Sequence, residues 1–112
     1  MGKKVLKDEF KFQDPYKGNE LVLKIIPVEN LEVISHQRKP SSYHVNHIMT
    51  SIKRIGYLVP VIVVEKNRED GKYLIIDGQH RFLAAKELGI EKLPCIVVPK
   101  YFENLMMNFN IE

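Results

Sequence analysis

The sequence predicts a small α/β (α+β) domain with a mixed sheet flanked by helices. Short runs of apolar, often β-branched residues, such as Val59 to Val64, have the length of buried strands. Residues 45–55 instead repeat apolar side chains every three or four positions, as an amphipathic helix does. Turn residues separate these runs. The chain has 112 residues, 45% of them hydrophobic and 28% charged, which suits one domain with one core.

The order of these runs gives the expected elements. Strands are expected at residues 21–26, 59–64, 73–76 and 95–98. Residues 28–34 are expected to form a strand or a short turn. Ser41 or Ser42 can cap the first helix, which Gly56 ends. A second helix is expected from Gln79 to Leu88, and a third from Tyr101. A charged turn joins the strands at 59–64 and 73–76, which predicts a hairpin.

Composition divides the chain into three parts. Residues 1–20 are lysine-rich and polar and are expected to form a flexible basic arm. Residues 21–99 hold the folded domain. Residues 100–112 hold the start of a C-terminal helix, which suggests a domain cut from a longer protein.

Charge and cysteine content narrow the class of protein. A net charge of +3 suits a polyanionic partner such as a nucleotide or DNA, although an ordinary soluble surface carries as much. The single cysteine, Cys95, excludes an internal disulfide and falls in an apolar run, as expected of a small core residue. No apolar run is long enough to span a membrane, and no secretory signal is present, so we expect a cytoplasmic protein without a membrane partner.

The stretch from Asp77 to Arg81 carries the chemistry. A strand runs into Gly78 and then directly into a helix, whose first turn has backbone N–H groups without intrahelical partners. Together with the helix dipole, these groups attract an anion. Gly78 allows close approach of the backbone, and Arg81 can bind phosphate oxygens in pairs. The alternative is a plain turn with a solvated Arg81, since neither established glycine-rich phosphate motif occurs.

This stretch and several others resemble the ParB/sulfiredoxin superfamily over about residues 25–98. The similar segments are Ile26-Pro27-Val28, Gln37-Arg38, Ser51-Ile52 with Gly56, Pro60 to Val64, and Asp77 to Arg81 with Ala84-Ala85. The resemblance implies a nucleotide-binding domain that takes CTP, or ATP or ADP, with Mg²⁺. Its implied phosphate contacts are Gln37, Arg38, Gly78, Gln79, His80 and Arg81, with Ser35 and His36 at the edge of the pocket.

Gln79 departs from both branches of that superfamily. Sulfiredoxin has a cysteine at this place. Because the amide of Gln79 cannot replace a thiolate nucleophile, sulfinic acid reduction is not expected of this chain. ParB has a glutamate there, and an amide cannot act as a general base. Nucleotide hydrolysis is therefore expected to be slow or absent.

Three functions follow from the resemblance. The main hypothesis is a nucleotide-binding switch in a ParB-like, DNA-associated partition protein, in which the bound nucleotide orders the segment from Lys100 onward and gates the formation of a homodimer. The second is an ATP- or ADP-dependent serine-type kinase, for which His36, Asp77 and His80 are the candidate catalytic residues. The third is a DNA-binding or nuclease accessory module. We expect no metal site held by the protein, since His44 and His47 have no third ligand near them in sequence.

Overall fold

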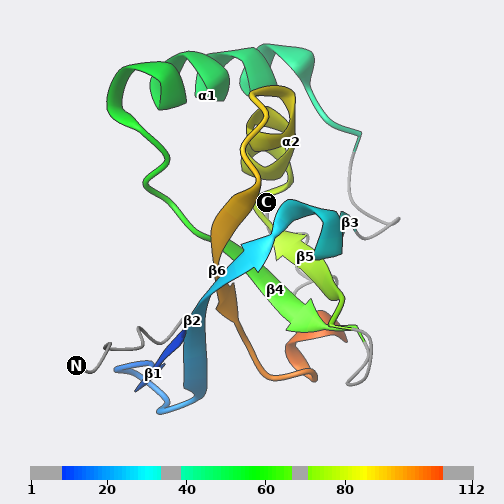
Figure 1. Cartoon of the computed structure of the whole chain (residues 1–112). Coiled ribbons are helices and arrows are strands. Elements are labelled where there is room, and N and C mark those ends of the chain that lie inside the picture. Colours follow the sequence, from blue (N-terminus) through cyan, green and yellow to red (C-terminus); the bar gives the residue numbers. More distant parts are fainter. Residues whose placement is uncertain (1–8, 34–38, 67–70, 105–112) are drawn as a thin grey trace, which may run out of the picture.

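A six-stranded mixed sheet forms the body of the domain, and two helices lie together at one end of it (Figure 1). The computed structural model describes residues 9–33, 39–66 and 71–104. The strands are β1 (Glu9–Gln13), β2 (Glu20–Pro27), β3 (Leu31–Val33), β4 (Val61–Glu65), β5 (Tyr73–Asp77) and β6 (Lys92–Val97). The helices are η1 (Val28–Asn30), α1 (Ser42–Ile55) and α2 (Gln79–Glu87).

The strand order β1-β2-β6-β4-β5-β3 confirms the mixed sheet. β4 and β5 pair antiparallel, so the predicted hairpin is confirmed, whereas β4 pairs parallel with β6 and β5 parallel with β3. The chain leaves β2 on one side of the sheet and, through η1, reaches the opposite edge as β3. Residues 28–34 were expected to form a strand or a short turn. In the structure, residues 28–30 form the helical turn η1 and residues 31–33 form the strand β3.

The predicted flexible arm is wrong for residues 9–13, which form β1. This strand pairs antiparallel with β2, placing Phe10 opposite Leu23 and Phe12 opposite Leu21. Phe10 and Phe12 stack with ring centroids 5.9 Å apart. These two aromatic residues alternate with charged and polar residues, as in a strand with one apolar face, but the pattern is only five residues long and lies in a lysine-rich, polar stretch. Residues 1–8, the rest of the expected arm before this strand, lie outside the described residues.

Asp14 holds the turn between β1 and β2. Its carboxylate accepts hydrogen bonds from the backbone N–H groups of Tyr16, Lys17 and Asn19, at 2.7 to 2.8 Å. The bond from Lys17 is the largest cause that lowers the pKa of Asp14, from 3.8 to about 2. Its contribution to stability is therefore present above pH 3.8 and is lost as the pH falls through about 2.

We expect Asp14→Ala to make the free energy of unfolding less dependent on pH between about 4 and 2. Urea unfolding of both proteins at several pH values in this range measures the difference. Asp8→Ala, six residues earlier in the chain, is the control. Parallel pH profiles for the wild type and Asp14→Ala would show that the carboxylate does not hold the turn.

β6 begins three residues before the predicted start at Cys95 and contains Pro94. Proline has no N–H and is placed in sheets where no partner needs one. Pro94 lies opposite Ile25 of β2, while the parallel pairing with β4 starts only at Cys95. Beyond β6, residues 102–104 are helical, and the remainder of the helix expected to Phe109 lies outside the described residues.

The main core lies between the sheet and α2. It contains apolar residues from five strands and from α2: Ile26, Leu31, Val61, Val63, Tyr73, Ile75, Phe82, Ala85, Leu93 and Cys95. The predicted core position of Cys95 is confirmed, since its side chain is fully buried. Burial raises the pKa of the Cys95 thiol to about 12, because a thiolate would lose its hydration there.

We therefore expect Cys95 to resist thiol reagents in the folded protein. Since the thiolate is the reactive form, labelling by a maleimide at pH 8 should proceed at the rate of unfolding. The rate of labelling, followed by mass spectrometry with and without urea, checks this expectation. Rapid stoichiometric labelling of the native protein would contradict it.

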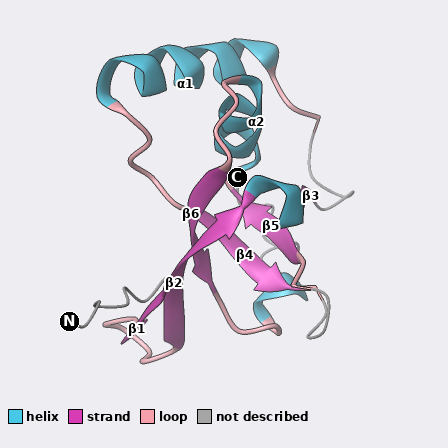
Figure 2. Cartoon of the chain, viewed as in Figure 1, coloured by secondary structure: helices cyan, strands magenta, loops and turns pink. Residues whose placement is uncertain are grey.

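The two helices differ in their relation to the sheet (Figure 2). α2 buries Phe82, Ala84 and Ala85, whereas α1 packs on α2 and has no fully buried residue. Ser41 caps α1 by accepting a hydrogen bond from the N–H of His44 at 3.3 Å, and Gly56 ends it, as predicted. Within the described residues, no helix has the length and apolar character needed to cross a membrane.

Candidate functional site

The turn from β5 into α2 has the form that the sequence predicted. Gly78 is the N-cap residue of α2 and has a φ of 105°, a conformation that side chains disfavour. A Cβ atom at this position would lie 2.7 Å from Val61 Cγ1 and 2.9 Å from Arg81 Nη2. Gly78, as the N-cap residue, has no side chain that could cap the start of α2. This helix end is thus held close to the sheet and keeps its capacity to bind an anion.

A cavity of about 350 Å³ opens beside this turn. Its lining comes from the segment before α1, from α1 itself and from the start of α2: Lys39, Ser41, His44, Ile48, Gly78, His80 and Arg81. The structure thus brings together three of the six expected phosphate contacts. Gln79, a fourth, is half-buried at the first position of α2 but is not among these lining residues.

Two helix N-termini converge on this cavity. Ser41 caps α1 and Gly78 caps α2, and both residues line it. His80 joins the two ends, because its Nε2 accepts a hydrogen bond from the N–H of Ser41 at 3.1 Å. The rings of His44 and His80 meet edge to face, with centroids 5.3 Å apart. Since each helix start carries a partial positive charge and Lys39 adds a full one, the cavity favours an anion.

Arg81 lies deeper than expected and supports the turn. Its Nη2 donates to the carbonyl oxygen of Pro60 at 3.1 Å, and its Nε has no hydrogen-bond partner within the described part of the chain. The half-buried Tyr57 lies beside it. Burial raises the pKa of Tyr57 to about 12, although the Arg81 charge opposes the shift. Arg81 therefore joins the segment before β4 to the turn between β5 and α2.

A second cavity, of about 270 Å³, adjoins the first and shares Ile48 and Arg81 with it. Its other lining residues come from the second half of α1 and the segment that follows: His47, Ser51, Ile52, Ile55, Gly56, Tyr57, Leu58 and Val59. Most of these side chains are apolar. The cavity beside Gly78 thus adjoins a more apolar cavity along α1.

Several predicted site residues cannot be placed at the cavity. Ser35, His36, Gln37 and Arg38 lie outside the described residues. Asp77 is half-buried at the end of β5 and is absent from the described lining of the cavity. Within the described residues, no group of three histidine, cysteine, aspartate or glutamate side chains could hold a metal ion.

The sequence reasoning did not assign Lys39, Ser41, His44 and Ile48 to the site. Ser41 was expected only as a helix cap, and His44 was considered only as a possible metal ligand that lacks further ligands near it in sequence. The available signal was position, because a lysine directly before a helix start and a histidine in its first turn flank the same backbone N–H groups.

A comparison with models of known protein families assigns the chain to a family. Residues 12–109 match the model of the ParB N-terminal domain. The chain belongs to this family. The expected relation to ParB and sulfiredoxin is confirmed, and with it the fold class.

Two curated relatives carry different functions. An ATP-dependent L-serine kinase of Desulfurococcus mucosus is 31% identical over 93 residues, which cover 83% of this chain and 34% of the kinase. A nucleoid occlusion protein of Bacillus mycoides is 32% identical over 97 residues, which cover 80% of this chain and 32% of that protein. The chain therefore spans about a third of the length of these relatives.

Two solved structures share the fold. The C-terminally truncated chromosome-partitioning protein ParB from Caulobacter crescentus, complexed with CTP-gamma-S, matches with a TM-score of 0.65 and 23% identity, covering 80% of this chain and 52% of that one. Sulfiredoxin from Arabidopsis thaliana matches with a TM-score of 0.62 and 27% identity, covering 76% of this chain and 96% of sulfiredoxin.

Proposed function

We propose that this domain binds the phosphates of a nucleotide, CTP or ATP, in the cavity between the starts of α1 and α2. The observation that carries the proposal is the convergence of two helix N-termini, with Lys39 and Arg81, on one cavity of about 350 Å³. The described lining residues of this cavity carry two positive charges and no carboxylate, which suits a polyphosphate. The CTP-gamma-S of the Caulobacter protein and the ATP dependence of the serine kinase support a nucleotide.

In this proposal Mg²⁺ accompanies the nucleotide. Mg²⁺ commonly binds through substrate phosphates and few protein carboxylates. The described residues offer no cluster of metal ligands, so the phosphate oxygens would supply most of the coordination. The protein residues at the cavity then hold and orient the phosphates.

We propose further that the domain acts as a nucleotide-dependent switch in a DNA-associated partition protein. The nucleoid occlusion relative and the ParB structure support this role, and the DNA contacts would lie in a longer parent protein or on a basic surface. The implied Gln37 and Arg38 would approach the phosphates from the segment before Lys39. Dimerisation is part of the same proposal.

Titration calorimetry with CTP, ATP and ADP, each with Mg²⁺, tests the nucleotide site. We expect Lys39→Ala to weaken binding about tenfold, because one charge-assisted contact to phosphate is lost. Lys53→Ala, an exposed lysine in the last turn of α1, is the matched control and should bind as the wild type does. Absence of binding by the wild type, or equal losses in both variants, would disprove the proposed site.

The kinase of Desulfurococcus mucosus keeps a second function open, phosphate transfer from ATP or ADP to serine. Among the described lining residues of the cavity, His80 and His44 are the candidates for a general base, while His36 lies outside the described residues. Incubation with ATP and serine, followed by detection of phosphoserine, separates a kinase from a switch. Product formation that His80→Ala abolishes would replace the switch proposal.

The third function, a DNA-binding or nuclease accessory module, predicts a different outcome in binding experiments. It requires DNA binding that weakens steeply with salt, without any nucleotide binding. A filter-binding series from 50 to 200 mM salt, run beside the calorimetry, distinguishes the two.

A further inference from the structure

Positive charge is concentrated on α1 and the segments beside it. Between Glu32 and Glu65 the sequence holds four of the 17 lysines and arginines and none of the 14 aspartates and glutamates. The rest of the chain, with 13 basic and 14 acidic residues, therefore has a formal net charge of −1, although the whole chain has +3. Two of the four positive side chains, Lys53 and Arg54, are exposed in the last turn of α1 and form no ion pair with any described carboxylate.

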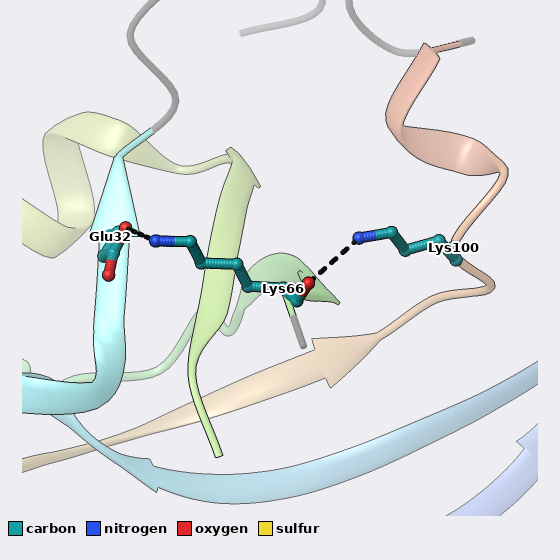
Figure 3. Close-up of polar contacts among 3 residues, drawn as sticks. All are labelled: Glu32, Lys66 and Lys100. Atoms are coloured by element: carbon teal, nitrogen blue, oxygen red, sulfur yellow. Dashed lines mark hydrogen bonds and ion pairs between the residues drawn. The ribbon is translucent and has the colours of Figure 1, made fainter. Parts of the chain in front are cut away.

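Lysines around the sheet have partners within the chain. Lys66 Nζ lies 3.0 Å from Glu32 Oε1, and Lys100 Nζ donates to the carbonyl oxygen of Lys66 at 3.3 Å (Figure 3). Lys24 Nζ lies 3.9 Å from Glu9 Oε1. The sequence of α1 contains no carboxylate that could pair with its own positive charges. The charge on α1 is therefore free to attract an anion from outside the chain.

One side of α1 faces away from the rest of the domain. The half-buried apolar residues of α1 lie on the side toward α2, where Val45 and Met49 line a cavity together with Leu83. α2 lies between α1 and the sheet (Figure 1), so α1 is the outermost element at this end. With 3.6 residues per turn, the opposite side carries six exposed residues, which we call the outer α1 face. They are Tyr43, Asn46, His47, Thr50, Lys53 and Arg54.

The side chains of the outer α1 face suit a nucleic acid backbone. All six carry a hydrogen-bond donor, and these residue types commonly contact phosphate oxygens. Tyr43 is 74% exposed, and its ring stacks on that of His47 with centroids 6.3 Å apart. The face has no aliphatic side chain to serve as the apolar centre of a protein interface. A helix of 14 residues is about 21 Å long, and an exposed α-helix fits the major groove of B-DNA.

We propose that the outer α1 face is a contact surface for duplex DNA, with Lys53 and Arg54 bound to backbone phosphates. The inference rests on the proposed association with DNA, for which it supplies a surface within this domain. It does not depend on the nucleotide, because none of the six residues is among the described lining of the cavity of about 350 Å³. The two sites lie on different sides of the same helix.

Fluorescence anisotropy with a labelled duplex of about 20 base pairs, from about 50 to 200 mM salt, tests the surface. The double variant Lys53→Ala/Arg54→Ala should weaken binding about tenfold at low salt. It should also reduce the salt dependence of log K by about two, because two phosphate contacts are lost. Lys11→Ala/Lys17→Ala is the charge-matched control, since both lysines are exposed in β1 and the β1–β2 turn, far from α1 in Figure 1. It should weaken binding by no more than about twofold.

Equal weakening by the two double variants would overturn the proposal, because binding would then follow net charge and not a particular face. Absence of duplex binding by the wild type, or tighter binding of single strands, would overturn it as well. Amide NMR shifts on addition of the duplex give an independent readout, and they should be largest for residues 43–54. Calorimetry with nucleotide on the Lys53→Ala/Arg54→Ala variant should show unchanged affinity. Failure of the DNA surface and failure of the nucleotide site are thus observed separately.

Discussion

Gly78→Ala is expected to destabilise the domain severely and to abolish nucleotide binding. A non-glycine residue at a φ of 105° costs about 1 to 2 kcal/mol. The added methyl group would also lie 2.7 Å from Val61 Cγ1 in the fully buried wall of the core, and such overpacking costs about 1 to 3 kcal/mol. Together these terms predict a fall in Tm of more than about 10 °C.

Nucleotide binding should fail for a related reason. The methyl group would press on Val61 and on Arg81 Nη2, so the turn must move away from β4. The start of α2 would move with it and lose its alignment with Ser41 on the opposite side of the cavity. Calorimetry well below the Tm of the variant measures this loss separately from unfolding.

Gly89→Ala is the matched control for this variant. Gly89 has a φ of 76°, but no atom lies within 4 Å of a Cβ at that position. It should therefore show the backbone strain alone, with a fall in Tm of a few degrees and unchanged affinity. If both variants lose the same stability, contact with Val61 is not what requires glycine at residue 78.

How much of this domain the sequence predicts depends on how local each signal is. The hairpin, the caps of α1 and the glycine turn before α2 rest on residues adjacent in sequence, and all three are confirmed. β1 did not stand out, because its alternating pattern contains only two phenylalanines within a lysine-rich, polar stretch, and its pairing with Leu21 and Leu23 of β2 is what identifies it as a strand. The start of β6 was missed because Pro94 is acceptable only where β4 does not yet pair.

The site divides in the same way. Gly78, His80 and Arg81 were predicted because strand, glycine and arginine follow one another in sequence. Lys39, Ser41 and His44 reach the cavity only through the packing of α1 on α2, with His80 bound to the N–H of Ser41. No spacing in the sequence reports a contact between residues that lie 39 positions apart.

Arg81→Met is expected to lose both stability and nucleotide affinity. Methionine keeps an unbranched apolar stem of similar length but no guanidinium group. The carbonyl of Pro60 would lose its donor, and a hydrogen bond to a charged group contributes about 1.5 to 3 kcal/mol. For a domain of this size, a Tm about 6 to 15 °C lower follows. Loss of a guanidinium beside the phosphates should weaken CTP or ATP binding about 10- to 100-fold.

Comparison with inorganic tripolyphosphate shows whether the guanidinium acts on the phosphates. If it does, Arg81→Met should weaken tripolyphosphate and nucleotide by the same factor, while Arg54→Met, an exposed arginine in the last turn of α1, changes neither affinity nor Tm. If Arg81→Met lowers the Tm but leaves the affinity unchanged, Arg81 stabilises the fold through its hydrogen bond to Pro60 and does not bind the phosphates. The anion would then be bound by Lys39 and the two helix starts, because these lie at the cavity independently of that bond.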